Sequence, residues 1–424
     1  MPSEEPVPEE PAAGGSAVTD GQRPLEGILV ADFSRVLAGP LCSMTLADLG
    51  ARVIKVERPG AGDDTRSWGP PWSETGATYF ESVNRNKESV CLDLNDDGGR
   101  RLARELALRA DVLVENFKPG GLARLGLAYP ELSAENPGLI CVSISGFGAE
   151  GGRDLPGYDF VVQALGGLMS ITGEVDGPPM KAGVALVDVL TAKDAAIAVL
   201  AALQARRSTG RGSHIQLNLL SSLQGALVNQ AQAYLGAGSV PARMGNAHPS
   251  IVPYQLLGCA DGPLAVACGN DSQFARLAAE LGAPELAEDP RFATNSARVE
   301  RRDVLIPLLE ELLETAPAAV WQQRLTGAGV PAGRVAGIDE GIAYAASLGL
   351  QPTMEVRDSS GQAAGRQIRH PALWDPPLAP RAEAPPRLGQ HTGEVVAWLR
   401  DRTDGAAEAM TETTGAEAGL PAQR

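Results

Sequence analysis

Short apolar runs alternate with amphipathic stretches through the first third of the chain. The apolar runs are rich in Val, Ile and Leu and fall at residues 28–33, 52–56, 90–94, 111–116 and 139–145. Runs of this length and composition are typical of buried strands. The intervening stretches have the spacing of helices and fall at about residues 40–50, 97–109, 120–127 and 129–135. This alternation predicts an α/β fold with a mostly parallel sheet covered by helices on both faces.

The pattern changes in the middle of the chain. Helices are predicted near residues 158–169 and from 189 to about 207, followed by a strand at 214–218 and a helix to about 234. From about residue 241 a polar loop leads into two strands, at 254–257 and 264–268, which a turn at 260–263 joins. Amphipathic helices follow at 272–281, 298–314 and 317–326. These elements predict a smaller α+β domain, after which the chain is expected to return to the main sheet.

At 424 residues the chain is long for one domain and suits two. Residues 1–22 and 402–424 are rich in Pro, Glu, Ala, Gly and Thr, so we predict that both tails are disordered. Between them we expect the N-terminal part of a large α/β domain at 23–225, a small α+β domain at 226–330, and a return to the large domain at 331–401.

Charge and composition exclude several classes of function. The net charge is −16 and no basic stripe is interleaved with aromatic residues, so nucleic acid is not an expected partner. The five cysteines are scattered without a CxxC spacing, which indicates free thiols in the cytoplasm and no metal site. No apolar run reaches about 18 residues, and the chain begins without a signal peptide, so we expect no contact with a membrane. Dinucleotide, P-loop and serine-hydrolase motifs are also missing from the sequence, so we expect no permanently bound cofactor.

Asp188 ends an apolar, strand-like run and directly precedes the helix predicted from residue 189. Aspartate at such a position commonly caps a helix and needs no catalytic role. The same position suits an anionic nucleophile, because the helix dipole and the free N–H groups keep a carboxylate ionised. Asp159 follows Gly157-Tyr158 and equally suits a turn or a helix cap. These residues alone leave both interpretations open.

Five segments, in this order and at this spacing, resemble the class III coenzyme A transferases, the group of formyl-CoA transferase and carnitine CoA-transferase. They are Val36-Leu37-Ala38-Gly39-Pro40, Ile54-Lys55-Val56-Glu57-Arg58-Pro59, Asn84-Arg85-Asn86-Lys87, Val114-Glu115-Asn116-Phe117-Lys118-Pro119-Gly120 and Gly183-Val184-Ala185-Leu186-Val187-Asp188. The resemblance covers about residues 24–400. It implies a Rossmann-like large domain joined to a smaller one, and a homodimer whose two subunits are interlocked.

The resemblance also implies roles for individual residues. Asp188 is expected to attack the thioester carbonyl of an acyl-CoA, giving a mixed anhydride and free CoA, with Asp159 as a supporting residue. The positions expected to bind CoA are Leu37, Ala38, Arg58, Leu92, Asn95, Asn116, Phe117, Lys118, Arg124 and Tyr158. Leu37 and Asn95 stand where formyl-CoA transferases have Gln and Lys, so formyl-CoA does not follow as the donor.

The segment Gly245-Asn246-Ala247-His248-Pro249-Ser250 resembles the Gly-Asn-x-His-Pro loop of transferases that act on dicarboxylates and other organic acids. We expect Gly245, Asn246 and His248 to form the loop that selects the acid. A single histidine in a loop rich in Gly and Pro is also compatible with a structural role.

Three functions fit this family. The first is an acyl-CoA:carboxylate CoA-transferase, whose partners are an acyl-CoA, a small carboxylic acid and a second copy of the chain. The second is a racemase of the α-methylacyl-CoA type, and the third is an acyl-CoA binding protein without chemistry. Racemases of this fold have a His-Asp pair where this chain has Tyr158-Asp159, and a glycine run where it has Val189-Leu190. Both differences favour transfer.

Overall fold

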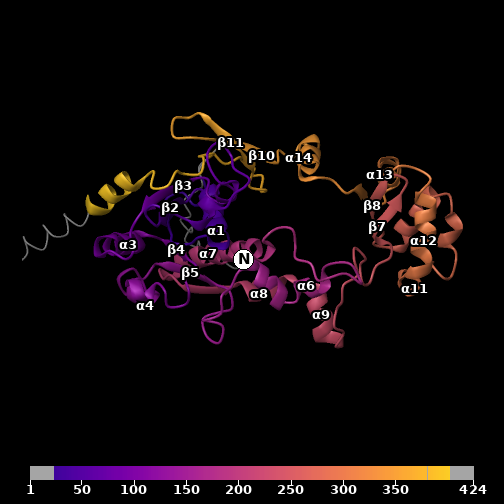
Figure 1. The fold of residues 1–424 in the computed structure, drawn as a ribbon, viewed down its shortest axis with the longest axis horizontal. Helices are drawn as coiled ribbons and strands as arrows, with labels where there is room; N and C mark the ends of the chain where they lie inside the picture. The colour runs from indigo at the N-terminus through magenta and orange to yellow at the C-terminus, as the bar shows by residue number, and fades with distance from the viewer. Residues whose placement is uncertain (1–22, 380, 402–424) are drawn as a thin grey trace, which may run out of the picture. The chain divides into compact units, whose positions relative to one another are not determined.

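The computed structural model describes residues 23–379 and 381–401, which form two compact units (Figure 1). Of the described residues, the first unit contains 23–143, 195–215, 354–379 and 381–401. The second contains residues 144–194 and 216–353. The predicted disordered tails, 1–22 and 402–424, lie outside the described residues. The domain boundaries predicted at 226 and 330 both fall inside the second unit and stay predictions.

The first unit is built on a six-stranded sheet in the order β3-β2-β1-β4-β5-β6. Its strands are β1 (Leu29–Asp32), β2 (Arg52–Glu57), β3 (Lys87–Cys91), β4 (Val112–Glu115), β5 (Ile140–Ser145) and β6 (His214–Asn218), the last two crossing into the second unit. The pairs β1–β2, β1–β4, β2–β3 and β4–β5 are parallel. The predicted α/β fold with a parallel sheet is confirmed, and its strand order is that of a doubly wound Rossmann sheet.

Helices cover both faces of this sheet. They include α1 (Ala38–Asp48), α2 (Thr78–Glu81), α3 (Asp97–Arg109), α4 (Tyr129–Glu135) and the shared α7 (Leu186–Thr209), with short 3₁₀ turns η1 (Asp64–Ser67) and η2 (Ala123–Leu125). Ala31, Ile54 and Leu113 belong to one core cluster with residues of α3. Val30 and Val53, which point to the opposite face, are also buried. Burial on both faces explains why these strands read as continuous apolar runs.

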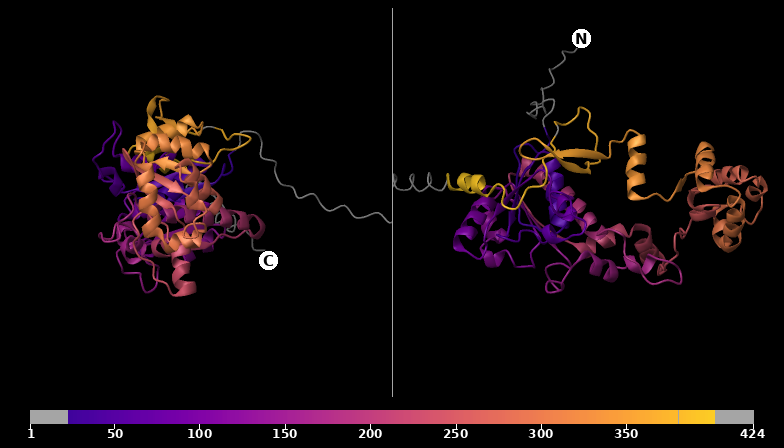
Figure 2. Two further views of the ribbon diagram at one scale, coloured as in Figure 1. Left: turned by 90° about the vertical axis from the view of Figure 1, so that its right-hand side faces the viewer. Right: turned by 45° about the horizontal axis from the view of Figure 1, so that its top comes forward.

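Residues 391 and 392 lie against β3, at the edge of the sheet. The N–H of Ser89 donates to His391 Nδ1 at 3.1 Å, and the N–H of Cys91 donates to Thr392 Oγ1 at 3.0 Å. A helical segment at 392–401 then adds Val395 and Leu399 to the core. Before it, β10 (Thr353–Arg357) and β11 (Ala363–Ile368) form a separate two-stranded sheet rather than joining the main one (Figures 1 and 2).

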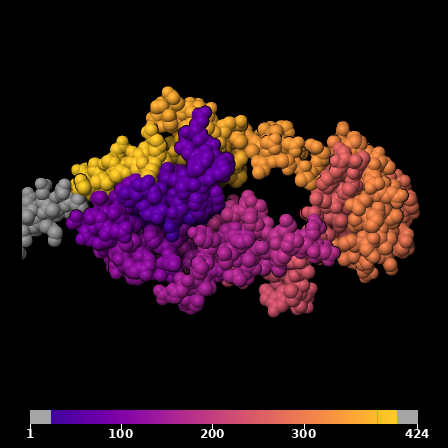
Figure 3. Space-filling model, viewed as in Figure 1, coloured from indigo at the N-terminus to yellow at the C-terminus, as the bar shows by residue number. Residues whose placement is uncertain are grey.

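The second unit contains a three-stranded antiparallel sheet of β7 (Tyr254–Cys259), β8 (Gly262–Ala267) and β9 (Ala332–Arg334). Its helices and 3₁₀ turn are α5 (Asp159–Leu165), α6 (Leu168–Ile171), α8 (Leu219–Ala226), α9 (Val228–Ala237), α10 (Asp271–Glu280), η3 (Pro284–Ala287), α11 (Asn295–Glu300), α12 (Arg302–Leu313), α13 (Ala318–Gly327) and α14 (Ile338–Ser347). The β7–β8 turn is where the sequence predicts it. Phe274, Phe292 and Trp321 belong to one core cluster with residues of β7 and β8, and Figure 3 shows this region in orange.

Candidate active site

The first turn of α7 carries Asp188, the predicted nucleophile. The helix begins at Leu186 rather than at 189, and the N–H of Val189 already donates to the Ala185 carbonyl at 3.1 Å. The apolar run before Asp188 is therefore not a strand, and the interpretation of Asp188 as a helix cap is wrong. Ala185 has no side-chain acceptor for the free N–H groups of this turn.

Asp159 supplies the cap that α7 lacks. Its Oδ1 accepts from the N–H of Val187 at 2.7 Å and from the N–H of Asp188 at 3.3 Å. These are the groups that a helix-capping side chain normally binds, here satisfied by a residue from another helix. Asp159 is buried and forms the first residue of α5. The carboxylate of Asp159 thus binds the helix N-terminus whose first turn carries Asp188.

A close backbone contact places Asp159. A Cβ added to Gly157 would lie 2.5 Å from the Cα of Gly146, which is closer than side-chain atoms approach backbone. Both positions therefore require glycine, and the two segments meet directly before Tyr158. Tyr158 is extended and its side chain is exposed. The loop after β5 is in this way connected to the start of α5.

Burial and charge raise the pKa of Asp188 to about 7. The first cause is the loss of water around the half-buried carboxyl group, and the second is the negative charge of Asp159. The sequence predicts the opposite, a carboxylate kept ionised by the helix N-terminus. The difference arises because Asp159 takes the N–H groups of that turn. The Asp188 carboxylate is consequently ionised above about pH 7, where it is more basic than an ordinary carboxylate. Its role as the nucleophile stays a prediction.

The predicted CoA-binding positions in the first unit gather at the carboxyl ends of neighbouring strands. Leu37 and Ala38 follow β1 and start α1, while Asn116 and Phe117 follow β4. Asn116 joins the two loops, because its Oδ1 accepts from the N–H of Arg35 at 3.0 Å and its Nδ2 donates to the Arg35 carbonyl at 2.7 Å. The order of the sheet reverses between β1 and β4, and ligands of doubly wound folds bind at such a point.

The remaining predicted positions differ in what they offer a ligand. Arg58 directly follows β2 and pairs with Asp64 at 2.6 Å, although its side chain stays exposed. Lys118 and Arg124 are exposed, whereas Leu92 is buried and Asn95 donates its side-chain amide to Asp93 at 3.1 Å. The exposed cations suit phosphate groups. Their role in binding CoA stays a prediction.

A buried charge network holds the loop after β1. Lys55 Nζ lies 2.9 Å from Asp63 and donates to the Ser34 carbonyl at 2.8 Å. The Asp63 carboxylate accepts from the N–H of Val36 at 3.2 Å. Val36 has a φ of 71°, a conformation that strains a β-branched residue and persists only where its surroundings impose it. A Cβ on Gly39 would lie 2.2 Å from Ser34, so α1 also packs tightly against this loop.

The network continues beneath the loop. Lys87 Nζ and Asp32 lie 3.1 Å apart with both side chains fully buried. Despite the cost of burial, the charges of Lys87 and Lys55 lower the pKa of Asp32 to about 2, while burial lowers the pKa of Lys87 to about 8. Asp32, Lys55 and Lys87 all lie inside strands. Charged residues within apolar runs are the signal in the sequence that could have revealed this network.

The predicted acid-selecting loop is fixed by neighbouring residues of the second unit. The N–H of Gly245 donates to the Gly173 carbonyl at 3.0 Å, and Arg302 Nη2 donates to the His248 carbonyl at 2.6 Å. His248 Nδ1 accepts from the N–H of Ser250 at 3.0 Å, so in neutral His248 the proton is on Nε2. The half-buried His248 can therefore donate one hydrogen bond, while Asn246 is exposed.

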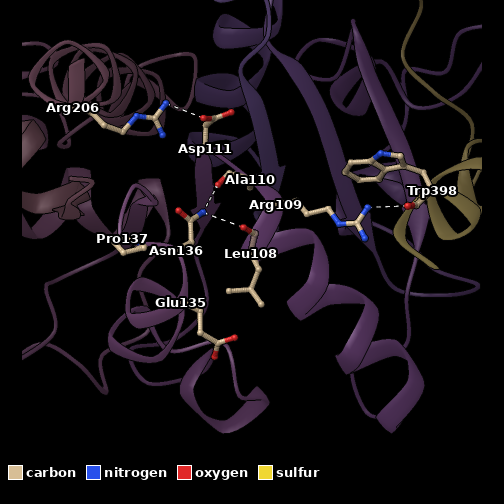
Figure 4. Close-up of a pocket in the computed structure, with 9 residues that line it drawn as sticks. All are labelled: Leu108, Arg109, Ala110, Asp111, Glu135, Asn136, Pro137, Arg206 and Trp398. Atoms are coloured by element: carbon tan, nitrogen blue, oxygen red, sulfur yellow. Dashed lines mark hydrogen bonds and ion pairs between the residues drawn. The ribbon is translucent and has the colours of Figure 1, made fainter. Parts of the chain in front are cut away.

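A cavity of about 630 Å³ lies at the amino ends of β4 and β5, opposite the predicted CoA positions (Figure 4). Arg206 pairs there with Asp111 at 2.8 Å, and Asn136 Nδ2 donates to the Ala110 carbonyl at 3.0 Å. Arg109 donates to the Trp398 carbonyl at 2.8 Å. Arg109 also pairs with Glu105, and Glu135 pairs with Arg104. The charged groups of this cavity therefore all have partners within the protein, which favours structural contacts over a ligand site.

Two further classes of site are absent from the described part of the chain. It contains no group of three or more His, Cys, Asp or Glu side chains able to hold a metal ion. Residues 23–379 and 381–401 also include no helix long and apolar enough to cross a membrane.

Comparison with known proteins shows the family to which the chain belongs. The model of CoA-transferase family III matches residues 25–392. The chain belongs to this family. It is 44% identical over 393 residues to the succinate–glutarate CoA-transferase of Agrobacterium fabrum, covering 89% of this chain and 96% of that protein. It is 43% identical over 319 residues to the acetyl-CoA:oxalate CoA-transferase of Acetobacter aceti, covering 75% and 82%.

A solved structure shares the fold of this CoA-transferase. A CaiB/BaiF family protein from Brucella suis superimposes with a TM-score of 0.80 at 43% identity, covering 89% of this chain and 100% of that one. The recognition of the family and of an α/β CoA-transferase from the sequence is therefore confirmed. Sequence reasoning did not single out Gln163, which is buried and donates to the predicted supporting residue Asp159. Gln163 lies four residues after Asp159 in a predicted apolar helix, and this spacing indicates that the two side chains are neighbours.

Proposed function

We propose that this CoA-transferase moves CoA from an acyl-CoA to a small carboxylic acid through an anhydride on Asp188. The observation that carries the proposal is the Asp188 carboxyl group at the start of α7, whose pKa burial and Asp159 raise to about 7. The relatives named for succinate–glutarate and acetyl-CoA:oxalate transfer support the same class of donor and acceptor.

The chemistry balances without an external energy source. Asp188 attacks the thioester carbonyl, the C–S bond breaks, and CoA leaves as the thiolate. The thiolate then attacks the Asp188 carbonyl of the anhydride, which releases the donor acid and leaves a thioester on Asp188. The acceptor carboxylate displaces CoA from that thioester, and CoA finally attacks the acceptor carbonyl to regenerate Asp188. Activation is preserved at each step, so water must be excluded from the anhydrides.

Proton exchange of the racemase type is disfavoured by the contacts of Asp159. Its Oδ1 binds the N–H groups of Val187 and Asp188, and its Oδ2 accepts from Gln163 Nε2 at 2.6 Å. A carboxylate bound on both oxygens is poorly placed to take and return a proton at an acyl α-carbon. The same contacts suit a fixed charge that positions Asp188.

The proposed function is tested by supplying succinyl-, acetyl- and formyl-CoA with a panel of carboxylic acids and identifying new acyl-CoA products by mass spectrometry. We expect succinyl-CoA with a short dicarboxylate such as glutarate to give the fastest transfer, because the loop at 245–250 resembles that of dicarboxylate transferases. Exchange of the α-proton without an acceptor would support the racemase instead. Absence of transfer to every acid would contradict the proposal.

We further propose that a second copy of the chain covers α14 and α9. Helix α14 has no buried residue, and Ile338, at its start, is 86% exposed. Tyr344 and Leu348 on the same segment and Leu235 on α9 are exposed as well. A soluble protein rarely leaves such apolar surfaces uncovered. A homodimer, as the resemblance implies, buries them.

The expected dimer is measured by light scattering after size-exclusion chromatography. The wild-type protein should elute at about twice its chain mass of 44.1 kDa. Exchanging Ile338 and Leu348 for Glu places charges on the proposed contact, so it should shift the protein towards the monomer at micromolar concentration. The matched exchange of exposed Val304 for Glu on α12 should leave the mass unchanged. A monomeric wild type would contradict the proposal.

A further inference from the structure

Gln163 uses both ends of its side-chain amide next to Asp159. It lies on α5 and is fully buried. Its Nε2 donates to Asp159 Oδ2 at 2.6 Å, and its Oε1 accepts from the N–H of Ala182 at 2.8 Å. No charged residue takes part in this contact other than Asp159. A buried neutral amide with both ends bound is thus inserted between Asp159 and the segment that leads to Asp188.

These hydrogen bonds have only one possible direction. The N–H of Ala182 can only donate, so the amide oxygen of Gln163 must face it and the amide nitrogen must face Asp159. The Oδ2 atom of Asp159 must then accept from the amide nitrogen of Gln163. Asp159 must also accept on the other oxygen, because the N–H groups of Val187 and Asp188 can only donate. Donors approach both oxygens of Asp159, which only an ionised carboxylate satisfies.

The contacts hold the segment before the nucleophile at both ends. Gln163 binds Ala182 at its start, and Asp159 binds Val187 and Asp188 at its end. Gly183 and Val184 between them are exposed. The position of Asp188 therefore depends on two side chains of α5 that lie one helical turn apart.

We propose that Gln163 is a positioning residue of the transferase, which orients Asp159 and the 182–188 segment so that Asp188 is presented at the start of α7. This inference rests on the proposed function, because it requires Asp188 to react. Gln163 itself does not touch the substrate. Being neutral, it orients Asp159 without cancelling the negative charge beside Asp188. A cation at this position would pair with Asp159 and remove that charge.

The direction of the hydrogen bonds allows a reciprocal exchange. Gln163→Glu brings two carboxyl groups into contact, and Asp159→Asn brings two amide nitrogens into contact unless one amide turns and loses its other partner. The double exchange restores every contact. The new amide at 159 donates to the new carboxylate at 163 and still accepts from Val187, while the carboxylate at 163 accepts from Ala182. The negative charge then lies on residue 163, which does not contact the first turn of α7, rather than on residue 159, which does.

We expect each single exchange to lower kcat on the order of a hundredfold with little change in KM for the acyl-CoA, since displacement of a reacting group by about 1 Å has this effect. The kcat of the double variant should be at least about tenfold higher than that of either single variant. The acid limb of the wild-type pH–rate profile is expected near the Asp188 pKa of about 7, and that of the double variant should lie at a lower pH. A residue that only stabilises the fold would not move this limb.

A matched control is Gln273→Glu on α10, because Gln273 Oε1 also accepts from a backbone N–H, that of Gly269, at 2.7 Å. It should retain the wild-type kcat and pH profile. Two results would overturn the role of Gln163. One is a wild-type kcat in the single variants, and the other is a double variant whose kcat is no higher than that of either single variant.

Hydrogen exchange separates this inference from the proposed function. Amide exchange at Ala182 and Val187, measured by mass spectrometry, should be faster in Gln163→Glu and in Asp159→Asn than in the wild type, and slow again in the double variant. Unchanged exchange in the single variants would overturn the inference even if the enzyme transfers CoA. A wild type that transfers CoA to no acid would reject the proposed function, whereas the exchange pattern would still test the contacts of Gln163.

Discussion

Replacing Asp188 with Ala is expected to lower the rate of CoA transfer by more than about ten-thousandfold, as loss of a covalent nucleophile does. The side chain is the only acid in the first turn of α7. The carboxylate of Asp159 cannot replace it, because both of its oxygens accept hydrogen bonds from N–H groups. The measurement is kcat with the donor and acceptor that the wild type uses.

Asp194→Ala is the matched control, since Asp194 is an exposed aspartate on the same helix. It should retain wild-type turnover. Brief incubation of the wild type with acyl-CoA followed by hydroxylamine should modify Asp188 and no other residue. Turnover retained in Asp188→Ala, or modification at another residue, would contradict the nucleophile assignment.

Asp188→Asn should be inactive yet folded, so its stability tests whether removal of the Asp188 carboxylate abolishes activity without unfolding the protein. The pKa of Asp188 rises from an ordinary value of 3.8 to about 7 on folding, so the wild type loses stability as the pH rises between these values. The uncharged variant does not titrate and escapes this loss. Above about pH 7 we expect its free energy of unfolding to exceed that of the wild type by up to about 4 kcal/mol, measured by urea denaturation.

The second large effect is expected for Lys55→Met, which should lower the free energy of unfolding by about 3–5 kcal/mol. Lys55 and Asp63 lie 2.9 Å apart with side chains that are each 1% exposed. Removing the cation leaves the Asp63 carboxylate buried without its partner and frees the Ser34 carbonyl. The strained turn at Val36 should relax as well, so CoA should bind more weakly in calorimetry.

Arg104→Met provides the comparison for this prediction. Arg104 pairs with Glu135 on the surface of the first unit, where 34% and 55% of the two side chains are exposed. Exposed pairs contribute about 0–1 kcal/mol, so this variant should be nearly as stable as the wild type. Equal stability of Lys55→Met and Arg104→Met would refute the importance of the buried network.

Local patterns predicted most elements of the first unit. The helix expected at 97–109 is α3, and the strand expected at 214–218 is β6. Both stand out because a regular apolar spacing is bounded by polar or turn residues. The start of α7 could not be predicted in this way. Val184 to Val187 form an apolar, β-branched run that favours a strand, but capping by Asp159 turns it into a helix.

The sequence by itself determined the class of fold, the family and the identity of Asp188 as the residue to examine. These follow from periodicity and from short segments whose residues are neighbours in the chain. Only the tertiary structure decided that Asp159 caps the helix of Asp188, that Gln163 orients Asp159, and that Lys55 and Asp63 hold the turn at Val36. It also placed the loops after β1 and β4 side by side through the strand order. Hydrogen bonds and ion pairs between distant segments leave no periodic trace in a sequence, because each partner alone fits many other environments.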